Sequence, residues 1–287
     1  MASTPGKPAT ALPPSLPPIV IDSSASGVGL DLKSLWTYRE LLYFLIWRDV
    51  KVRYKQTALG VLWVILQPLV MMLIFTVLFG QLGNIPSEGI PYSLFAFAGL
   101  LPWTFFSGAV SLSSNSVVNS ANLITKVYFP RLIVPIAAVG ATLVDLALSF
   151  GVLALLMAYR HQAPSINLLM LPLLVLLLIL VALGFGILMS ALNVKYRDVR
   201  IALPFLIQVW FFASPVIYPL SLVPPKVRWA VTLNPLSGII EGFRVALYGH
   251  RNFDWVSLSI SAIVTLLLMV CAVYTFRKME SGFADIV

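Results

Sequence analysis

Charged residues and cysteine are both scarce in this chain of 287 residues. Only 10% of the residues are charged, whereas a soluble domain carries about 25%. The single cysteine, Cys271, lies inside an apolar run, which excludes an intrachain disulfide and a cysteine metal centre. Because 59% of the residues are hydrophobic, we expect an integral membrane protein of the all-α class.

Several kinds of catalytic and nucleotide-binding motif are also missing. The sequence has no G-x-x-x-x-G-K-[ST] run to cradle a phosphate. It has no Ser/His/Asp set, no paired carboxylates and no metal-ligand spacing. We therefore predict no catalytic residue, no metal site and no cofactor in this chain. A protein of this kind that moves cargo uphill must take its energy from a partner or from an ion gradient.

The first 30 residues differ in composition from the rest of the chain. Six prolines between Pro5 and Pro18 lie among Ser, Thr, Ala and Gly. No basic start precedes an apolar core, so this stretch is not a signal peptide. We predict a disordered proline-rich tail over residues 1–30, followed by one transmembrane domain over residues 31–287.

Six apolar segments are long enough to cross the hydrocarbon core as helices, which takes about 20 residues. The predicted spans are residues 60–80, 93–115, 132–158, 167–190, 201–219 and 255–276. All but five of the 19 Lys and Arg residues lie before the first span, in alternate connections or after the last span. The positive-inside rule then places both termini in the cytoplasm of a multi-pass inner-membrane protein. The net charge of +8 fits anionic lipid head groups better than nucleic acid.

The connection between the fifth and sixth spans, residues 220–250, contains an apolar stretch that is too short to span. Residues 236–249 would form about 21 Å of helix, and four prolines in 214–225 interrupt the preceding segment. We predict short helices that re-enter the outer leaflet, with their non-helical backbone shielded from lipid. Glu241 and Arg244 lie three residues apart on one helix face and are predicted to pair.

Residues 34–55 predict an amphipathic helix that lies in the membrane interface before the first span. Thr37 and Glu40 match a helix capping box at its start. A polar stripe and neighbouring aromatic residues share one side of this helix: Thr37, Glu40, Arg48, Lys51 and Lys55, beside Trp36, Tyr43, Trp47 and Tyr54. A plain anchor and a moving element beside a lipid-linked substrate are both open interpretations.

Few polar residues fall inside the predicted spans. Asp145 lies near the middle of the third span, where a carboxylate is costly and normally faces the bundle interior. We expect it to be protonated or paired, because no other acidic residue or histidine lies in a span core to complete a proton relay. Ser107, Ser111 and Ser114 recur at helical spacing in the second span, which favours close helix packing or a polar channel wall.

Five ordered stretches resemble the membrane subunits of type-2 polysaccharide ABC exporters. They are WRDVKVRYKQTALGVLWVILQP (47–68), NLITKVYFPRLIVP (122–135), KYRDVR (195–200), SPVIYP (214–219) and NPLSGIIEGFR (234–244). The resemblance implies a six-span protomer, a homodimer, and two copies of a separate cytoplasmic ABC ATPase that binds ATP and Mg. It also implies a lipid-linked polysaccharide as cargo, such as an O antigen, a teichoic acid or a capsule.

Three sets of residues acquire expected roles from this resemblance and from their chemistry. The predicted head-group and gate residues are Trp36, Tyr43, Trp47, Arg48, Lys51, Arg53 and Lys55, whose cations would donate to phosphate oxygens. The predicted contacts to the ATPase are Tyr38, Arg39, Glu40, Asn119, Asn122, Lys126, Lys195, Tyr196, Arg197 and Asp198. The predicted channel aromatics, with core packing as their alternative, are Trp63, Trp210, Phe211, Phe212 and Tyr218.

The main alternative function is an ion-coupled carrier of a small or lipid solute, centred on Asp145. Such carriers usually have internal repeats and several buried ionisable residues, and a single central carboxylate is thin support. A membrane-embedded glycan-modifying enzyme lacks a catalytic set, and a lipid-binding scaffold is weaker still. The replacement Asp145→Asn separates a carrier, which should lose coupling, from an ATP-driven exporter, which should mostly keep transport.

Overall fold

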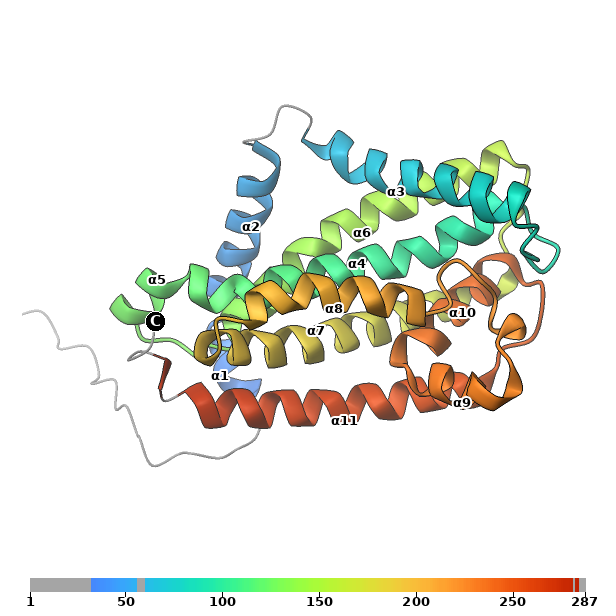
Figure 1. Cartoon of the computed structure of the whole chain (residues 1–287). Coiled ribbons are helices and arrows are strands. Elements are labelled where there is room, and N and C mark those ends of the chain that lie inside the picture. Colours follow the sequence, from blue (N-terminus) through green and yellow to red (C-terminus); the bar gives the residue numbers. More distant parts are fainter. Residues whose placement is uncertain (1–31, 56–59, 281, 284–287) are drawn as a thin grey trace, which may run out of the picture.

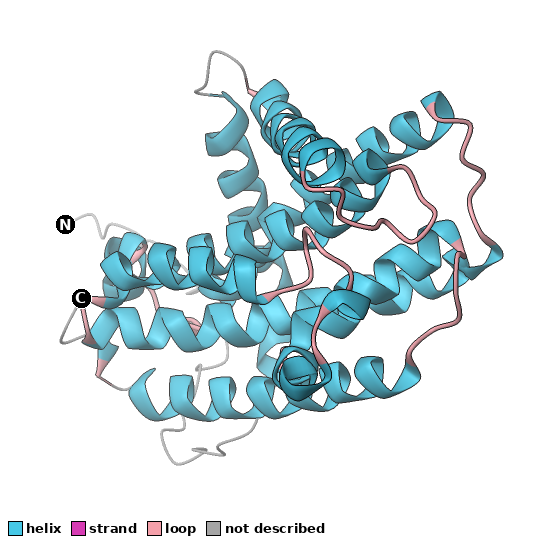
Figure 2. Ribbon diagram, turned by 45° about the vertical axis from the view of Figure 1, so that its right-hand side comes forward, coloured by secondary structure: helices cyan, strands magenta, loops and turns pink. Residues whose placement is uncertain are grey.

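The computed structural model describes residues 32–55, 60–280 and 282–283, and every regular element in these ranges is helical (Figures 1 and 2). The predicted disordered tail, residues 1–30, lies outside them. The α-helices are α1 (Leu32–Thr37), α2 (Arg39–Lys55), α3 (Val61–Phe75), α4 (Tyr92–Asn119), α5 (Ala121–Lys126), α6 (Ile133–Tyr159), α7 (Leu171–Lys195), α8 (Val199–Ala213), α9 (Pro225–Leu233), α10 (Pro235–Tyr248) and α11 (Trp255–Glu280). A π-helical stretch, η1 (Thr76–Leu82), continues α3, and two 3-10 turns are η2 (Ile166–Met170) and η3 (Leu220–Leu222).

Five helical segments are long and apolar enough to cross a membrane: α3 with η1, α4, α6, η2 with α7, and α11. They match five of the six predicted spans. The predicted span over 201–219 is wrong at its C-terminal end, because α8 stops at Ala213, two residues before Pro215. Proline lacks a backbone N–H and disfavours helix in the residue before it. The 15 residues of α8 give about 22 Å of helix, short of a hydrocarbon core of about 30 Å.

The centre of the bundle is α4, which packs against α3, α6, α7, α8 and α10. In the most apolar stretch of 18 residues in α4, 83% is buried, against 17–39% in the corresponding stretches of the other four long segments. Small residues permit the close approach of neighbouring helices. A Cβ added at Gly186 on α7 would lie 2.6 Å from Ser113 Oγ on α4, so a glycine at this position allows α7 to approach α4 closely.

One end of the bundle gathers α1, α5, the α7–α8 link and the end of α11, and α2 extends from it across the long helices (Figure 1). The single helix predicted over 34–55 is divided in two by a turn at Tyr38. One side of α2 packs Leu42 and Leu45 against the apolar core at this end, and the other exposes Phe44 and Trp47. Since both sides carry large apolar residues, the amphipathic character that we predicted is not confirmed.

The opposite end of the bundle contains α9 and α10 (Figure 1). Asn234 caps α10, because its side-chain oxygen accepts a hydrogen bond from the Leu236 backbone N–H at 3.1 Å. Pro235 follows at the first helical position, where its missing N–H costs nothing. The helix ends at Gly249, whose φ of 62° suits glycine in the left-handed region. Every residue of α10 is buried, so this short helix belongs to the core.

Candidate functional site

A cavity of about 640 Å³ lies where α2, α3, α4 and α6 meet. Its polar lining from α4 and α6 comprises Thr104, Ser107, Ser111, Thr142, Asp145 and Ser149. The helices α2 and α3 add Arg53, Tyr54, Trp63 and Gln67. Of the three serines that we considered for a polar wall, Ser107 and Ser111 on α4 do line this cavity. Ser114 is buried instead and donates to the Ser111 carbonyl at 2.9 Å.

Asp145 is paired, as the sequence predicted, and its partners come from α2. One carboxylate oxygen accepts from Arg53 Nη1, and the other accepts from the Tyr54 hydroxyl. The Arg53 and Asp145 side chains are 26% and 23% exposed, so the pair is reached by solvent from the cavity. Burial and the hydrogen bond to Asp145 raise the pKa of Tyr54, which keeps its hydroxyl protonated as a donor.

The remaining predicted head-group residues lie on α1 and α2 outside the lining of this cavity. Lys51 and Lys55 are exposed, while Arg48 is half-buried and pairs with Asp49 at 2.8 Å. The aromatic members of the predicted set, Trp36, Tyr43 and Trp47, are all exposed. Of the predicted cations, only Arg53 lines the cavity.

The predicted channel aromatics divide into two groups. Trp210 packs edge-on against Phe185 in the interior of the protomer, with ring centroids 4.5 Å apart. Trp210 is half-buried, whereas Phe211 is buried; its ring stacks on Phe75 and meets Trp103 edge-on. Phe212 and Trp63 are exposed, and Trp63 also lines the cavity. The core alternative therefore describes Trp210 and Phe211 in this structure.

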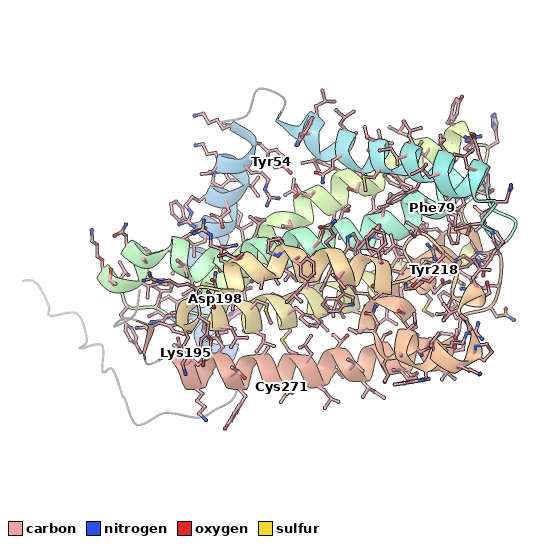
Figure 3. All side chains as sticks on the ribbon, viewed as in Figure 1. Tyr54, Phe79, Lys195, Asp198, Tyr218 and Cys271 are labelled. Atoms are coloured by element: carbon pink, nitrogen blue, oxygen red, sulfur yellow. The ribbon has the colours of Figure 1, made fainter. Side chains whose placement is uncertain are left out.

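Tyr218 lies in the segment between α8 and α9 and is half-buried. Its hydroxyl donates to the Phe212 carbonyl at 3.2 Å, and burial raises the pKa of this phenol. The hydroxyl is therefore occupied by the backbone of α8, and the ring lies at the end of the bundle opposite Lys195 and Asp198 (Figure 3).

The predicted ATPase contacts lie on α2, at the end of α4, on α5 and in the α7–α8 link. All of them are exposed except Tyr38, which is half-buried in the turn before α2. The short helix α5 carries Asn122 and Lys126 of this set. Arg39 and Lys195 lie over aromatic rings, those of Trp36 and Tyr196, with 5.5 Å and 5.3 Å from cation to ring centroid.

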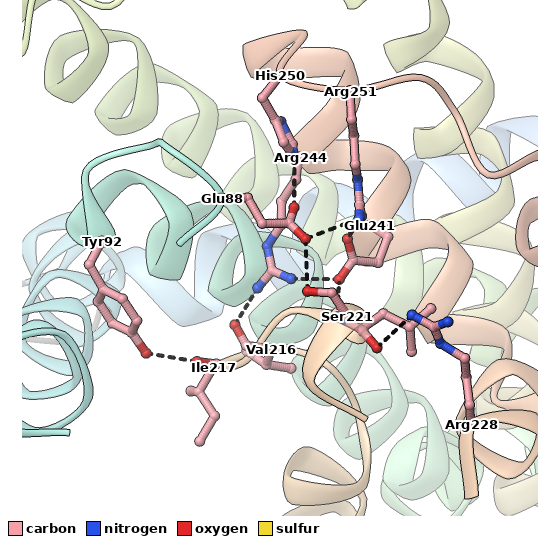
Figure 4. Close-up of polar contacts among 11 residues, drawn as sticks. Glu88, Tyr92, Val216, Ile217, Ser221, Arg228, Glu241, Arg244, His250 and Arg251 are labelled. Atoms are coloured by element: carbon pink, nitrogen blue, oxygen red, sulfur yellow. Dashed lines mark hydrogen bonds and ion pairs between the residues drawn. The ribbon is translucent and has the colours of Figure 1, made fainter. Parts of the chain in front are cut away.

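A second set of charged residues forms a network at the other end of the bundle (Figure 4). The predicted pair is present, with Arg244 Nη1 3.0 Å from Glu241 Oε1. Arg244 is fully buried; it also donates to the Val216 carbonyl at 2.6 Å and lies 3.6 Å from the centroid of the Phe95 ring. Burial lowers the pKa of Arg244, and the nearby Glu241 and Glu88 carboxylates oppose that shift.

Further members of this network were not predicted from the sequence. Glu88 accepts from Arg251 at 3.1 Å, and His250 lies 2.8 Å from its other oxygen. Arg251 also pairs with Glu241, which in addition accepts from the Leu220 backbone N–H at 3.1 Å. Glu88 and Arg251 are 163 residues apart in the chain, so no local pattern could reveal their contact.

Within the ranges given above, no three His, Cys, Asp or Glu side chains gather closely enough to hold a metal ion.

The chain is similar in sequence to one protein family and to several named transport proteins. Residues 40–248 match the family described as ABC-2 type transporter. Over 260 residues the chain is 33% identical to the O-antigen export system permease protein RfbA of Myxococcus xanthus, covering 88% of this chain and 98% of that protein. It is 28% identical over 249 residues to a Klebsiella pneumoniae protein of the same name, covering 86% and 95%. It is also 28% identical over 241 residues to the polysialic acid transport protein KpsM of Escherichia coli, covering 82% and 92%.

Proposed function

The chain belongs to the ABC-2 type transporter family, and from that premise we propose that it is the permease subunit of an ATP-driven exporter of a lipid-linked polysaccharide. The observation that carries this proposal is the similarity over nearly the whole chain to O-antigen permeases. The cargo would be a polysaccharide, because relatives named for O-antigen export and for polysialic acid transport both match.

A separate ATPase would supply the energy, because the sequence has no phosphate-binding loop of its own. Two copies of this partner would dock on the end of the bundle that carries α5 and the α7–α8 link. The exposed side chains at this end include both cations and an acid, as Lys126, Arg197 and Asp198 illustrate, so they offer complementary contacts to a charged partner surface. This end, with both termini, would then face the cytoplasm of the inner membrane.

The polysaccharide would cross between two copies of this chain. The outward faces of α3 and α8 would border this path, and both carry exposed apolar side chains. Trp63 and Phe212 lie on these faces and would give a sugar chain apolar stacking contacts. Trp210 and Phe211 would instead keep α8 packed on α4 and α7.

At the outer end, α9 and α10 would dip into the outer leaflet beside the exit. A short helix at that depth needs its backbone and charges satisfied by protein. The network around Glu241 and Arg244 provides this, since both side chains bond to each other and to backbone groups of the segment that follows α8. We therefore propose that this network fixes the outer helices and does not itself contact the cargo.

The test is reconstitution of the chain in proteoliposomes with the ABC ATPase that copurifies with it and with a lipid-linked glycan. Export should require ATP and should stop when the P-loop lysine of the ATPase is replaced. Collapse of proton and sodium gradients should leave it unchanged. Transport by this chain alone under an ion gradient would overturn the proposal and favour the carrier centred on Asp145.

Charge reversal tests the docking surface. Lys126→Glu together with Arg197→Glu should abolish copurification of the ATPase, because two attractive contacts become repulsive. Arg160→Glu is the matched control, since this exposed cation lies at the far end of α6. Loss of copurification in the control as well would argue against a specific surface.

A further inference from the structure

The contact between α2 and α6 has two parts of different kinds. Near the middle of α2 the contact is apolar and close, because the Ile46 side chain lies 2.8 Å from where a Cβ at Gly140 would be. Two turns later the contact is polar, and Asp145 receives both Arg53 and Tyr54. The first part belongs to a packed core, whereas the second opens onto the cavity.

A carboxylate held by a guanidinium and a phenol has the partners that a phosphate group would take. Arginine and tyrosine both donate hydrogen bonds to phosphate oxygens, and charge-assisted bonds of this kind are among the strongest in proteins. Both donors line the cavity, and about a quarter of the Arg53 side chain is accessible. A ligand in the cavity can therefore reach them without unpacking the bundle.

We propose that the Asp145 carboxylate occupies an anion site in the absence of cargo, and that the phosphate group of a lipid-linked glycan displaces it from Arg53 and Tyr54. The proposal deepens the exporter function and rests on it for the identity of the cargo. It assigns Asp145 as a specificity-determining residue that competes with the ligand.

The competition explains how such a site can select its ligand. Any incoming anion must replace a carboxylate that already satisfies both donors, and it must also tolerate the displaced charge nearby. A ligand with a single negative charge gains nothing over Asp145, whereas a diphosphate brings more charge and more acceptor oxygens. Selectivity then arises from a contact that disfavours the weaker ligands.

The rest of the cavity suits a sugar attached to that phosphate. The hydroxyls of Thr104, Ser107 and Ser149 donate to backbone carbonyls within their own helices, at 3.1, 3.2 and 2.9 Å. Their oxygen lone pairs remain as acceptors on the cavity wall. Sugar hydroxyls are donors, so this wall complements the first residue of a glycan.

Exchange of the ligand also has a mechanical consequence for α2. The end of this helix is held to α6 by the Asp145 pair, while its middle is held by apolar packing. Displacement of the carboxylate releases the first contact and leaves the second intact. The end of α2 can then move relative to α6 when the head group binds.

The experiment measures binding of farnesyl diphosphate to the full-length chain in phosphatidylcholine nanodiscs. Asp145→Asn should bind about tenfold more tightly than the parent, because the competing charge is gone while the donors remain. Arg53→Gln should lose binding by at least about tenfold. The double variant Arg53→Gln with Asp145→Asn removes both charges of this pair and should stay folded, yet it should bind as weakly as Arg53→Gln alone.

Asp254→Asn is the matched control, since it removes an acid at the other end of the bundle and should leave binding unchanged. Unchanged or weaker binding in Asp145→Asn overturns the competition. Tighter binding in the double variant overturns the role of Arg53.

Two further probes identify the source of the phosphate group. Inorganic pyrophosphate should bind at least about tenfold more weakly than farnesyl diphosphate, because it lacks the prenyl chain that the bilayer holds beside the site. Equal affinity would overturn the lipid-linked assignment in favour of a soluble anion, and equal binding of farnesol would overturn an anion site altogether.

These measurements need neither ATP nor a partner. Failure of export in the reconstituted system would therefore overturn the exporter function while leaving the competition at Asp145 intact.

Discussion

Two regions of the bundle hold their charged side chains in different ways. Beside α9 and α10, Glu241 pairs with Arg244 and Arg251, Arg251 also pairs with Glu88, and Arg244 is fully buried. Midway along α6, Arg53 and Asp145 are each about a quarter exposed beside a cavity. Buried charges with several partners cannot exchange those partners without a large desolvation cost. An accessible pair can, so the first arrangement suits a fixed framework and the second suits a binding step.

The largest expected effect is that of removing a buried guanidinium. Arg244→Met leaves Glu241 and Glu88 with one shared arginine and should destabilise the protein by about 3–5 kcal/mol. Arg53→Met should cost only about 1 kcal/mol, because its pair is accessible to solvent. The midpoint of thermal unfolding in detergent measures both. Equal shifts of the midpoint for the two variants would contradict the contrast between the buried network of Arg244 and the accessible pair of Arg53 and Asp145.

A pair of glycines on α4 tests the same contrast through packing. A Cβ at Gly99 would lie 2.5 Å from the Val216 carbonyl oxygen and 2.7 Å from Arg244 Nη2, whereas a Cβ at Gly108 would meet nothing within 4 Å. Gly99→Ala should therefore destabilise by about 1–3 kcal/mol. Gly108→Ala, in the same helix and lining the cavity, should stabilise by up to about 1 kcal/mol through better helix propensity.

The same thermal unfolding measurement serves both glycine variants. A destabilised Gly108→Ala would indicate that the cavity is filled in solution. A neutral Gly99→Ala would indicate that the packing of α4 against Val216 and Arg244 is not tight.

Elements defined by local patterns could be predicted from the sequence, and contacts between distant elements could not. The helix predicted over 236–249 is displaced by one residue from α10, because a short apolar run with Asn-Pro before it and glycine after it encodes its own ends. Arg53 and Asp145 were each singled out for their charge, but 92 residues separate them. Nothing local to either residue indicates that α2 packs against α6.

The aromatic residues of α8 were predicted as one set, with a channel and the core as the two alternatives. Consecutive residues on a helix point about 100° apart, so Trp210, Phe211 and Phe212 cannot all face one channel. The structure turns Phe212 outward and the other two inward. Helical periodicity could have shown this division, although not which residue faces outward.

The salt concentration should distinguish the accessible pair from the buried network, with a smaller effect on stability. Asp145→Asn is expected to lower stability by about 1 kcal/mol at low ionic strength, and that loss should shrink in about 1 M NaCl because screening weakens accessible ion pairs. The loss caused by Arg244→Met should not change, since its partners are buried. Thermal unfolding of each variant at both salt concentrations measures this, and a salt-dependent loss for Arg244→Met would place its network in contact with solvent.

The smallest effect concerns Asp254, an exposed acid that makes no ion pair in the described part of the chain. It caps α11 by accepting from the Ser257 backbone N–H at 3.1 Å and from the Ser257 hydroxyl at 2.6 Å. Burial raises the pKa of Asp254, but these hydrogen bonds outweigh burial and leave the pKa below its ordinary value. Asp254→Ala should therefore cost about 1 kcal/mol, and Asp254→Asn only a few tenths, because asparagine also caps helices.

The lowered pKa of Asp254 fixes the direction of the pH dependence. A carboxylate with a lower pKa in the folded state stabilises above its unfolded pKa of about 3.9 and loses that contribution as the pH falls through the folded value. The difference in thermal midpoint between the parent and Asp254→Ala should thus be constant near neutral pH and narrow in acid. A difference that widened in acid would mean that the protonated form makes the cap, and Asp254 would then be an unsuitable control for the charge at Asp145.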